Sequence, residues 1–445
     1  MSLKQEEPSM KRFPLVFLGL AVALAGHAYP FPLGEGGAPR SASPIGRSLK
    51  KGPLGESPRL PTLSAKAVSE IDALLQEAVR QGTVPGVVAI VTNKDRVLYH
   101  GAFGLMDTGK RKPMQKDSIF RIASMTKPVT SVAIMMLKEQ GKLGLDDPVS
   151  KYLPAFQNRE VISSFNPADA TYKTKKAANE VLIRHLLTNT SGLAYAFSND
   201  TVNRLQQKTQ VEAEDLPLLY EPGTRWTYSG STKVLGLVIE KITGGGLEKF
   251  FEQRIFRPLE LEDTAYSVPA AKAGRTVTIQ QREKGKLMEL PNPERLEGPA
   301  RGDGGLFSTA SDYAKFLQMF LNDGQWRGAT LVHKESIEAM TRNQIGNVIV
   351  DTQQTTNPLR SLNFPFGAGQ DKFGFGFQIT ASNKDNPNLR SPGSYTWAGI
   401  NNTHFWVDPK RQIAAVILMQ ILPFYDDGCM KVYRDFEAAI GRNLR

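Results

Sequence analysis

Short apolar runs with the length and composition of β-strands lie near both ends of the globular part of the chain. Two of them, residues 85–93 and 96–104, come early and are joined by the turn-like sequence Asn-Lys-Asp. Four more come late in the chain, at residues 373–380, 393–399, 402–409 and 412–420. The pattern predicts an early hairpin and a late group of strands, the last two joined by the turn DPKR.

Between and beside these runs, apolar residues recur with helical spacing. A first helix is predicted between Ser64, as its N-cap, and Gly82, as its C-cap. The stretch 156–179 is polar and irregular, and we interpret it as a surface insertion. Further helices are predicted within residues 121–141, 180–193, 231–244, 300–324 and 431–444.

The order of these elements predicts the fold class. Strands at both ends of the chain flank a helical middle, which favours an α/β (α+β) fold. We expect a mixed, mostly antiparallel sheet built from both chain ends and flanked by helices, with an inserted all-α domain. The α/β part would comprise about residues 63–120 and 300–445, and the helical part about 121–299. A catalytic cleft is expected between the two parts.

Residues 1–28 have the pattern of a secretory signal peptide. Lys11 and Arg12 precede an apolar stretch that ends in a small-x-small cleavage site. Residues 29–62 are rich in Pro, Gly and Ser, and are interpreted as a linker before a catalytic domain at 63–445. We expect export to a bacterial periplasm or to the extracellular space, with no stable membrane span after signal cleavage. An uncleaved N-terminal anchor is the alternative.

The composition of the 445-residue chain excludes several classes of protein. With 40% hydrophobic and 22% charged residues it is typical of a soluble globular protein. The formal net charge of +11 would permit attraction to nucleic acid, but no basic run with interleaved aromatics is present, so no nucleic-acid partner is expected. The single cysteine, Cys429, excludes a disulfide within one chain, and the five scattered histidines form no zinc motif.

Candidate chemistry is concentrated at Ser124 and Lys127, which stand three residues apart at the start of a predicted helix. Residues at i and i+3 share one face of a helix. The N-terminus of a helix favours negative charge, and a nearby ammonium makes a hydroxyl easier to deprotonate. The pair could therefore be a nucleophile and its partner. The ordinary alternative is that Ser124 caps the helix and Lys127 is solvated.

Two further stretches could contribute to the same cleft. Tyr228 lies in a tight turn before a helix and could act as a general base, or it could be a core aromatic. Gly399 interrupts an aromatic-rich strand, which is typical of close backbone approach. The N–H of Ile400 could then pair with that of Ser124 as an oxyanion hole. A β-bulge beside a packed Trp397 is the alternative.

In this order and spacing, the motifs SMTK at Ser124, YSG at Tyr228 and WAG at Trp397 resemble those of the serine β-lactamase-like hydrolases. That superfamily includes class C β-lactamases and penicillin-binding proteins, and the pattern is most similar to that of family VIII carboxylesterases. The stretches IRHLLTNTSGL, PGTRWTYS and THFWVDP also resemble family sequence. S-x-x-K alone is a weak signal, whereas the ordered set is strong.

The resemblance implies catalysis through an acyl-enzyme, without a metal or an organic cofactor. Ser124 would attack a carbonyl group, and Lys127 and Tyr228 would carry the proton. The backbone N–H groups of Ser124 and Ile400 would hold the oxyanion. Four residues would contact the substrate: Gly230, Trp397, Ala398 and Gly399.

Departures from the family pattern concern the substrate. β-Lactamases and DD-peptidases usually carry Asn two residues after the tyrosine, where this chain has Gly230. Their third motif begins with Lys or His, where this chain has Trp397, so a charge-assisted contact worth ~1.5–3 kcal/mol is missing. Asn189 also stands where the family has a histidine, with no explanation in the sequence. The departures favour a carboxylesterase on small neutral esters, with weak or no β-lactamase activity.

Two alternatives stay open. A β-lactamase, or a DD-peptidase or amidase acting on D-amino-acid-containing peptides, would use the same chemistry. A non-catalytic penicillin-binding-type sensor is disfavoured because Ser124, Lys127 and Tyr228 are all present. The expected partner is a small ester or lactam, and the sequence leaves the oligomeric state open.

Overall fold

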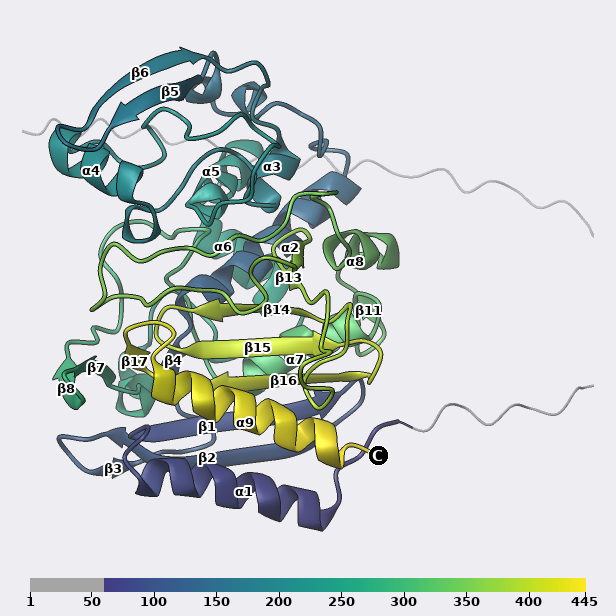
Figure 1. Cartoon of the computed structure of the whole chain (residues 1–445). Coiled ribbons are helices and arrows are strands. Elements are labelled where there is room, and N and C mark those ends of the chain that lie inside the picture. The colour runs from purple at the N-terminus through teal and green to yellow at the C-terminus, as the bar shows by residue number, and fades with distance from the viewer. Residues whose placement is uncertain (1–59) are drawn as a thin grey trace, which may run out of the picture. The chain divides into compact units, whose positions relative to one another are not determined.

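The computed structural model describes residues 60–445 (Figure 1). The predicted signal peptide (1–28) and nearly all of the predicted linker (29–62) lie outside these residues, so both stay predictions. Within residues 60–445, none of the helices is both long enough and apolar enough to cross a membrane.

An eight-stranded antiparallel sheet forms the centre of the structure, and it combines both ends of the described chain. The fully buried strand β1 (Gly86–Asn93) pairs on one side with β2 (Val97–Asp107) and on the other with β16 (Ile413–Leu418). The sheet order is β12-β13-β14-β15-β16-β1-β2-β3. The remaining strands are β3 (Lys112–Pro113), β12 (Lys372–Phe373), β13 (Gln378–Ile379), β14 (Tyr395–Gly399) and β15 (Thr403–Asp408).

Helices cover both faces of this sheet. The terminal helices α1 (Ala65–Arg80) and α9 (Asp427–Asn443) lie side by side on one face (Figure 1). The buried residues of both helices form one core with Trp406 and with Val87, Ala89 and Val91 of β1. Helix α7 (Ala310–Leu321) packs against β1 and β16 and belongs to the larger core on the opposite face. The predicted fold class is therefore confirmed.

The middle of the chain is built around α2 (Thr126–Glu139), whose residues are buried from Thr126 to Leu137. An all-round buried helix must be enclosed by other elements, and α5 (Ser231–Thr243) packs directly against it. The other helices are α3 (Ile183–Leu187), α4 (Asp200–Thr209), α6 (Leu247–Phe251) and α8 (Lys334–Met340).

The sequence predicted an all-helical middle region, and this prediction is wrong. The stretch interpreted as an irregular insertion contains the hairpin β5 (Glu160–Asn166) and β6 (Thr171–Lys176), and a second hairpin, β7 (Ile279–Glu283) and β8 (Lys286–Leu290), also falls in the region predicted to be helical. The first hairpin is largely exposed and the second is partly buried, and few apolar residues mark the alternation of either. Short ladders complete the fold: β4 (Phe120–Arg121) with β9 (Phe307–Ser308), β10 (Gln325–Trp326) with β11 (Ala329–Thr330), and β17 (Ile421–Leu422) with β7.

The predicted strand 373–380 is also wrong as a single element. It is interrupted between β12 and β13, where Gly376 adopts φ +93. A Cβ at Gly376 would lie 2.4 Å from the Ser131 hydroxyl of α2. The chain therefore bends here to approach the central helix closely, which only glycine permits.

Candidate active site

Ser124 lies in η1 (Ala123–Met125), a 3-10 helix of one turn directly before α2. The chain enters this turn from β4, which is fixed by its pairing with β9. Ala123 then adopts φ +46, in the left-handed region that a residue with a Cβ seldom occupies. Such local strain is characteristic of functional sites in proteins. The turn places Ser124 in the wall of a pocket of about 690 Å³.

The Ser124 hydroxyl contacts two other predicted site residues. The Tyr228 hydroxyl donates to Ser124 Oγ at 2.6 Å, and Lys127 Nζ donates to the same oxygen at 3.2 Å. The structure therefore brings Ser124, Lys127 and Tyr228 together, although Tyr228 follows Ser124 by 104 residues in the sequence. Both contacts have the lengths of ordinary hydrogen bonds.

Lys127 is 2% exposed, and its ammonium is fully coordinated by the protein. An ammonium has three donors. Besides Ser124 Oγ, the donors reach the backbone oxygen of Asp303 at 2.8 Å and the hydroxyl of Tyr195 at 3.1 Å. The cation is thereby held in one position, with no donor left over for solvent.

The turn that carries Tyr228 is fixed from several sides. Its N–H donates to the side-chain oxygen of Gln353 at 3.0 Å, and its carbonyl accepts from Tyr195 N at 3.2 Å. Asn189 supports the two flanking residues: its carbonyl accepts from Thr227 N at 2.9 Å, and its Oδ1 accepts from the Ser229 hydroxyl at 3.1 Å. These contacts account for Asn189, which the sequence left unexplained.

A charged network extends from Lys127 through Tyr195. The Tyr195 hydroxyl donates to the Asp303 carboxylate, and Arg301 grips that carboxylate with two hydrogen bonds of 3.0 and 2.8 Å. Burial, followed by the charge of Asp303, raises the pKa of Tyr195 well above its usual value. Burial works to raise the pKa of Asp303, but Lys127 and Arg301 together hold it below its ordinary value. The network thus consists of a protonated tyrosine and an ionised aspartate.

The segment that carries Asp303 approaches the central helices very closely. The Thr130 hydroxyl of α2 donates to the Gly302 carbonyl at 2.6 Å. A Cβ at Gly302 would lie 2.2 Å from the backbone oxygen of Thr232 on α5. Only glycine fits between the two helices, and this glycine sets Arg301 and Asp303 beside Lys127.

The proposed oxyanion donors lie on two adjoining segments. Ser124 and Ile400 line the same pocket, and neither backbone N–H has a hydrogen-bond partner within the described residues. Between them, Gly399 approaches η1 so closely that a Cβ would lie 2.3 Å from the Ile122 carbonyl. The glycine is therefore required by close backbone approach, as its place in the strand indicated.

The four predicted substrate contacts fall into two groups. Trp397 and Ala398 line the Ser124 pocket, whereas Gly230 and Gly399 are not among its lining residues. The Trp397 ring packs 5.1 Å from the ring of Tyr228, between centroids. It is therefore an apolar support for Tyr228 as well as a wall of the pocket.

Gly230 is explained by packing. A Cβ at Gly230 would lie 2.1 Å from the carboxylate of Glu214. Glu214 forms an ion pair of 3.0 Å with Lys233. The space beside this residue is therefore filled by an acidic side chain. Trp406 of β15 is in the core under α9 and does not line the pocket.

The pocket wall contains apolar and positively charged surfaces. Arg121 donates to the Pro293 carbonyl at 2.9 Å and stacks on Phe307, and exposed Arg360 lies elsewhere in the wall. In residues 60–445 neither arginine has an acidic partner within ion-pair distance. The part of the chain that the structure describes has no cluster of His, Cys, Asp and Glu suited to a metal ion.

Sequence reasoning missed Tyr195, Gln353, Arg301 and Asp303. Tyr195 lies only two residues beyond the helix predicted within 180–193, and Arg301-Gly-Asp303 lies in a stretch interpreted only as the entry to a helix. The run of glycines around Asp303 was the one usable signal, since it indicates close backbone approach. Gln353 belongs to a segment with no regular structure around it and gave no signal.

Comparisons with known proteins show what the chain is similar to. The family model described as Beta-lactamase matches residues 71–440. Protein Rv1367c of Mycobacterium tuberculosis is 31% identical over 79% of this chain and 89% of its own length. Esterase EstB of Burkholderia gladioli is 27% identical over 80% of this chain and 91% of its own. The ML-236A carboxylate methylbutanoyltransferase mlcH of Penicillium citrinum is 27% identical, covering 86% and 96%.

Among solved structures, the unliganded selenomethionyl form of simvastatin synthase (LovD) from Aspergillus terreus superposes with a TM-score of 0.73. It is 23% identical in sequence, and the match covers 85% of this chain and 98% of that chain. At this identity the likeness establishes the fold, which agrees with the arrangement of sheet and helices.

Proposed function

The chain belongs to the Beta-lactamase family and is a serine hydrolase, and we propose that it is a carboxylesterase that works through an acyl-enzyme on Ser124. The observation that carries the proposal is the pair of hydrogen bonds that Ser124 Oγ receives, from Tyr228 at 2.6 Å and from Lys127 at 3.2 Å. A hydroxyl whose oxygen lies within hydrogen-bond distance of a phenol and an amine can pass its proton to either group once that group has itself lost a proton.

The proposed steps balance as follows. Ser124 Oγ bonds to the ester carbonyl carbon while its proton moves to the Lys127–Tyr228 pair, which reacts in the form that holds one proton fewer, as a Tyr228 phenolate or a neutral Lys127 amine. The N–H groups of Ser124 and Ile400 hold the negative oxygen of the tetrahedral intermediate. The bond to the alcohol oxygen then breaks, and that oxygen takes the proton. Water attacks the acyl group, gives a proton to the same pair, and the acid leaves as Ser124 recovers its hydrogen.

The proposed substrates are neutral carboxylic esters, with weak or absent β-lactam hydrolysis. Support comes from Trp397, which gives the pocket an apolar wall where a cation would be needed for a lactam carboxylate. The pocket volume of about 690 Å³ lies within the range of drug-sized ligand sites, so acyl groups longer than acetyl would fit. The alternatives, a β-lactamase or a DD-peptidase or amidase, would need a recognition group that Gly230 and Trp397 do not supply.

The decisive experiment compares initial rates on p-nitrophenyl butyrate and on nitrocefin. Ser124→Ala should lower ester turnover by a factor of about 10³ or more, because the nucleophile is lost. Ser131→Ala removes another buried hydroxyl from the same helix and should leave the rate within about twofold. Lack of ester turnover by the folded wild type would refute the esterase proposal, and efficient nitrocefin hydrolysis would favour a β-lactamase.

Two added substrates sharpen the test. A p-nitrophenyl hemisuccinate, which carries a carboxylate, should react more slowly than the butyrate if the substrates are neutral. A faster hemisuccinate would assign Arg121 and Arg360 to an anionic substrate group. Release of D-alanine from a model peptide would identify the peptidase alternative, and a fluorophosphonate adduct lost in Ser124→Ala would exclude a non-catalytic sensor.

Acyl transfer to an alcohol is a second candidate, supported by the similarity to a methylbutanoyltransferase. An alcohol in place of water would attack the acyl-enzyme and form a new ester. With p-nitrophenyl butyrate and a primary alcohol present, the ratio of the alcohol's butyrate ester to butyric acid distinguishes the two. An ester yield no higher than its yield without enzyme excludes transfer to that alcohol.

We also propose that the chain is exported and processed after Ala28, on the pattern of its first residues. Mass spectrometry of protein recovered from a periplasmic fraction would test this. Recovery of only the full-length chain, in the membrane fraction, would favour the uncleaved anchor.

A further inference from the structure

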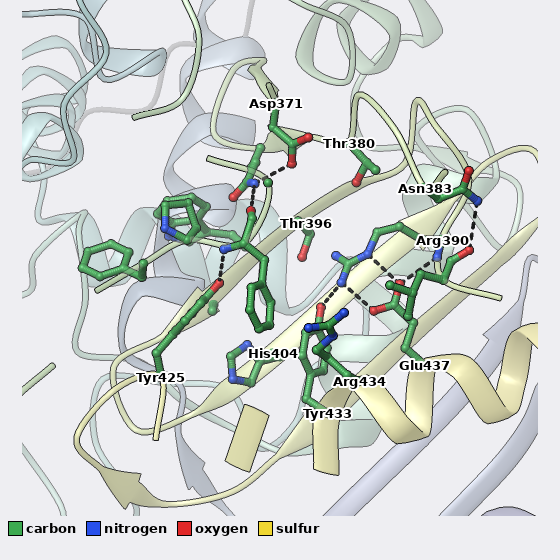
Figure 2. A pocket seen from close by; sticks show the side chains of 18 of the residues that line it. Asp371, Thr380, Asn383, Arg390, Thr396, His404, Tyr425, Tyr433, Arg434 and Glu437 are labelled. Carbon is green, nitrogen blue, oxygen red and sulfur yellow. Dashed lines mark hydrogen bonds and ion pairs between the residues drawn. The ribbon is translucent and has the colours of Figure 1, made fainter. Parts of the chain in front are cut away.

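A second pocket, of about 200 Å³, lies on the α9 face of strands β14 and β15. Because successive residues of a strand face opposite sides, Thr396 and Ala398 face this pocket, while Trp397 between them packs against Tyr228. His404, the partner of Ala398 in the sheet, also lines it. Figure 2 shows His404 at the base of the pocket, between Tyr425 and Tyr433.

His404 is the unusual member of this pocket. It is 2% exposed, and its Nε2 is buried without a hydrogen-bond partner among residues 60–445. Burial, assisted by the charge of Arg390, lowers the pKa of His404 to about 3. The ring is therefore neutral at ordinary pH and has one N–H donor and one acceptor. A buried polar group without a partner is unfavourable, so it points to a missing ligand atom.

The buried charged groups of the pocket already have partners, whereas Asp385 and Arg434 are exposed at its surface. Arg390 donates to the Glu437 carboxylate with Nε at 2.8 Å and Nη2 at 2.7 Å. The Asp371 carboxylate accepts from Gln378 at 2.6 Å and from Ala381 N at 2.9 Å (Figure 2). In the buried part of the pocket, the hydrogen-bonding capacity that is left therefore belongs to neutral groups, which favours a neutral ligand there.

Aromatic rings form the rest of the walls. The Tyr433 ring stacks on His404 with centroids 4.5 Å apart, and Phe366 packs 5.3 Å from Tyr425. Phe366 is 41% exposed and carries the guanidinium of Arg434 over its ring at 4.9 Å, which places it at the mouth. A cavity of about 150 Å³ is known to hold benzene when its lining is apolar. This pocket is large enough for a substituted ring, and it has polar groups for the substituent.

We propose that this pocket is a second ligand site, which binds a small neutral aromatic molecule whose hydroxyl group hydrogen-bonds to His404. The ring would lie among Phe366, Tyr425 and Tyr433, and the hydroxyl would reach the buried imidazole. The site does not depend on the reaction assigned to Ser124, although Trp397, Ala398 and Phe424 contribute to the walls of both pockets.

The test is calorimetric titration of the full chain with p-cresol and with toluene, which differ by the hydroxyl alone. Wild type should bind p-cresol about tenfold more tightly than toluene, the size expected for a well-made hydrogen bond to a buried group. His404→Phe keeps an aromatic ring against Tyr433 and removes both nitrogens. This variant should bind p-cresol about tenfold more weakly than wild type and should bind toluene equally well.

A matched pair of exposed variants locates the ligand. Phe366→Ala and Leu296→Ala each remove an apolar side chain that is 41% exposed, the first from this pocket and the second from the Ser124 pocket. Phe366→Ala should weaken both probes about fivefold, and Leu296→Ala should change neither. Because both side chains are exposed, these variants keep the test decisive if His404→Phe does not fold.

Three results would overturn the proposal. The first is wild-type binding of p-cresol no tighter than that of toluene, including no binding of either. The second is an effect of Leu296→Ala in place of Phe366→Ala, which would put p-cresol beside Ser124. The third is a folded His404→Phe variant that binds p-cresol as tightly as wild type.

Discussion

A pocket lies on each face of β14. The two pockets contain similar charged pairs, but they differ in whether their buried polar groups have hydrogen-bond partners. Each has a buried carboxylate gripped by an arginine: Asp303 with Arg301 beside Ser124, and Glu437 with Arg390 beside His404. On the Ser124 side, all three donors of Lys127 have acceptors. On the other side, a buried nitrogen of His404 has no partner in the described chain.

The difference separates two uses of buried polar groups. Dipoles and charges that are already in position stabilise a transition state without reorganising during the reaction. A buried group without a partner does the opposite, because its free energy improves only when a ligand arrives. The Arg301 side chain is 51% exposed and that of Arg390 is 12% exposed, so the two ion pairs should also differ in their contribution to stability. Matched substitutions on the two faces can test this contrast.

The largest contrast is expected between two tyrosines. Tyr228→Phe removes the hydroxyl that donates to Ser124, and kcat on p-nitrophenyl butyrate should fall by a factor of about 10²–10⁴, the usual range for a proton-transfer group. Tyr433→Phe removes a hydroxyl that accepts from Arg390 in the second pocket. Its kcat should stay within about twofold of wild type. Equal kcat for Tyr228→Phe and wild type would remove Tyr228 from the mechanism.

A second contrast compares the carboxylates. Asp303→Asn should lower kcat by about tenfold, because Tyr195 and Arg301 lose the group that orients them beside Lys127. Glu437→Gln should leave kcat nearly unchanged but destabilise the fold by about 3–5 kcal/mol, since Arg390 keeps a buried, uncompensated charge. Asp303→Asn should destabilise the fold less than Glu437→Gln, because the half-exposed side chain of Arg301 is solvated.

Urea denaturation and steady-state kinetics on both variants check this second contrast. Tyr195→Phe is the companion to Asp303→Asn: it breaks the same connection to Lys127 without altering a charge. A loss of kcat in Asp303→Asn with wild-type KM indicates positioning. A loss that follows the fraction of unfolded protein would mean that Asp303 acts on stability alone.

Much of the fold and the central pair could be predicted because the signals are local. Strand alternation, the helix after Ser124, and the turn at Tyr228 each depend on a few consecutive residues. Ser124 and Lys127 share a helix turn, so their contact follows from spacing alone. The ends of the first helix were also predictable to within one residue: Ser64 is the N-cap and accepts from Ala67 N at 3.2 Å, whereas the C-cap is Gln81 and the predicted Gly82 follows it with φ +69.

The remainder of the site depends on contacts that no local pattern specifies. Tyr195 and Asp303 meet Lys127 only because α2 and α5 pack together and Gly302 fits between them. Gly230 was predicted as a substrate contact from its place in a local motif. The adjoining space is filled by Glu214, which no local pattern indicates. The hairpin of β5 and β6 was missed since its strands are mostly exposed and carry little apolar alternation.

A third prediction uses the neutral His404. Unfolded, this histidine takes up a proton near pH 6.5; folded, it does so only near pH 3. The unfolded state therefore binds more protons between these values, so stability falls as the pH falls below about 6.5 and is unaffected above it. From pH 7 to pH 5, wild type should lose about 2 kcal/mol more than His404→Phe. Urea melts at both pH values measure this, and parallel losses in the two proteins would contradict a neutral buried imidazole.

The smallest effect concerns Gly230 and the proposed weakness of lactam hydrolysis. Gly230→Asn alone should not increase kcat/KM for nitrocefin, because the new side chain would meet the Glu214 carboxylate, 2.1 Å from its Cβ. Combined with Glu214→Ala, the amide gains room, and one hydrogen bond to a lactam amide should raise kcat/KM by a few-fold, at most about tenfold. Glu214→Ala alone is the control, and Lys233 keeps Glu212 as a partner at 3.5 Å. If Gly230→Asn alone raised nitrocefin turnover, Glu214 would be a movable neighbour, and the missing amide would itself limit lactam hydrolysis.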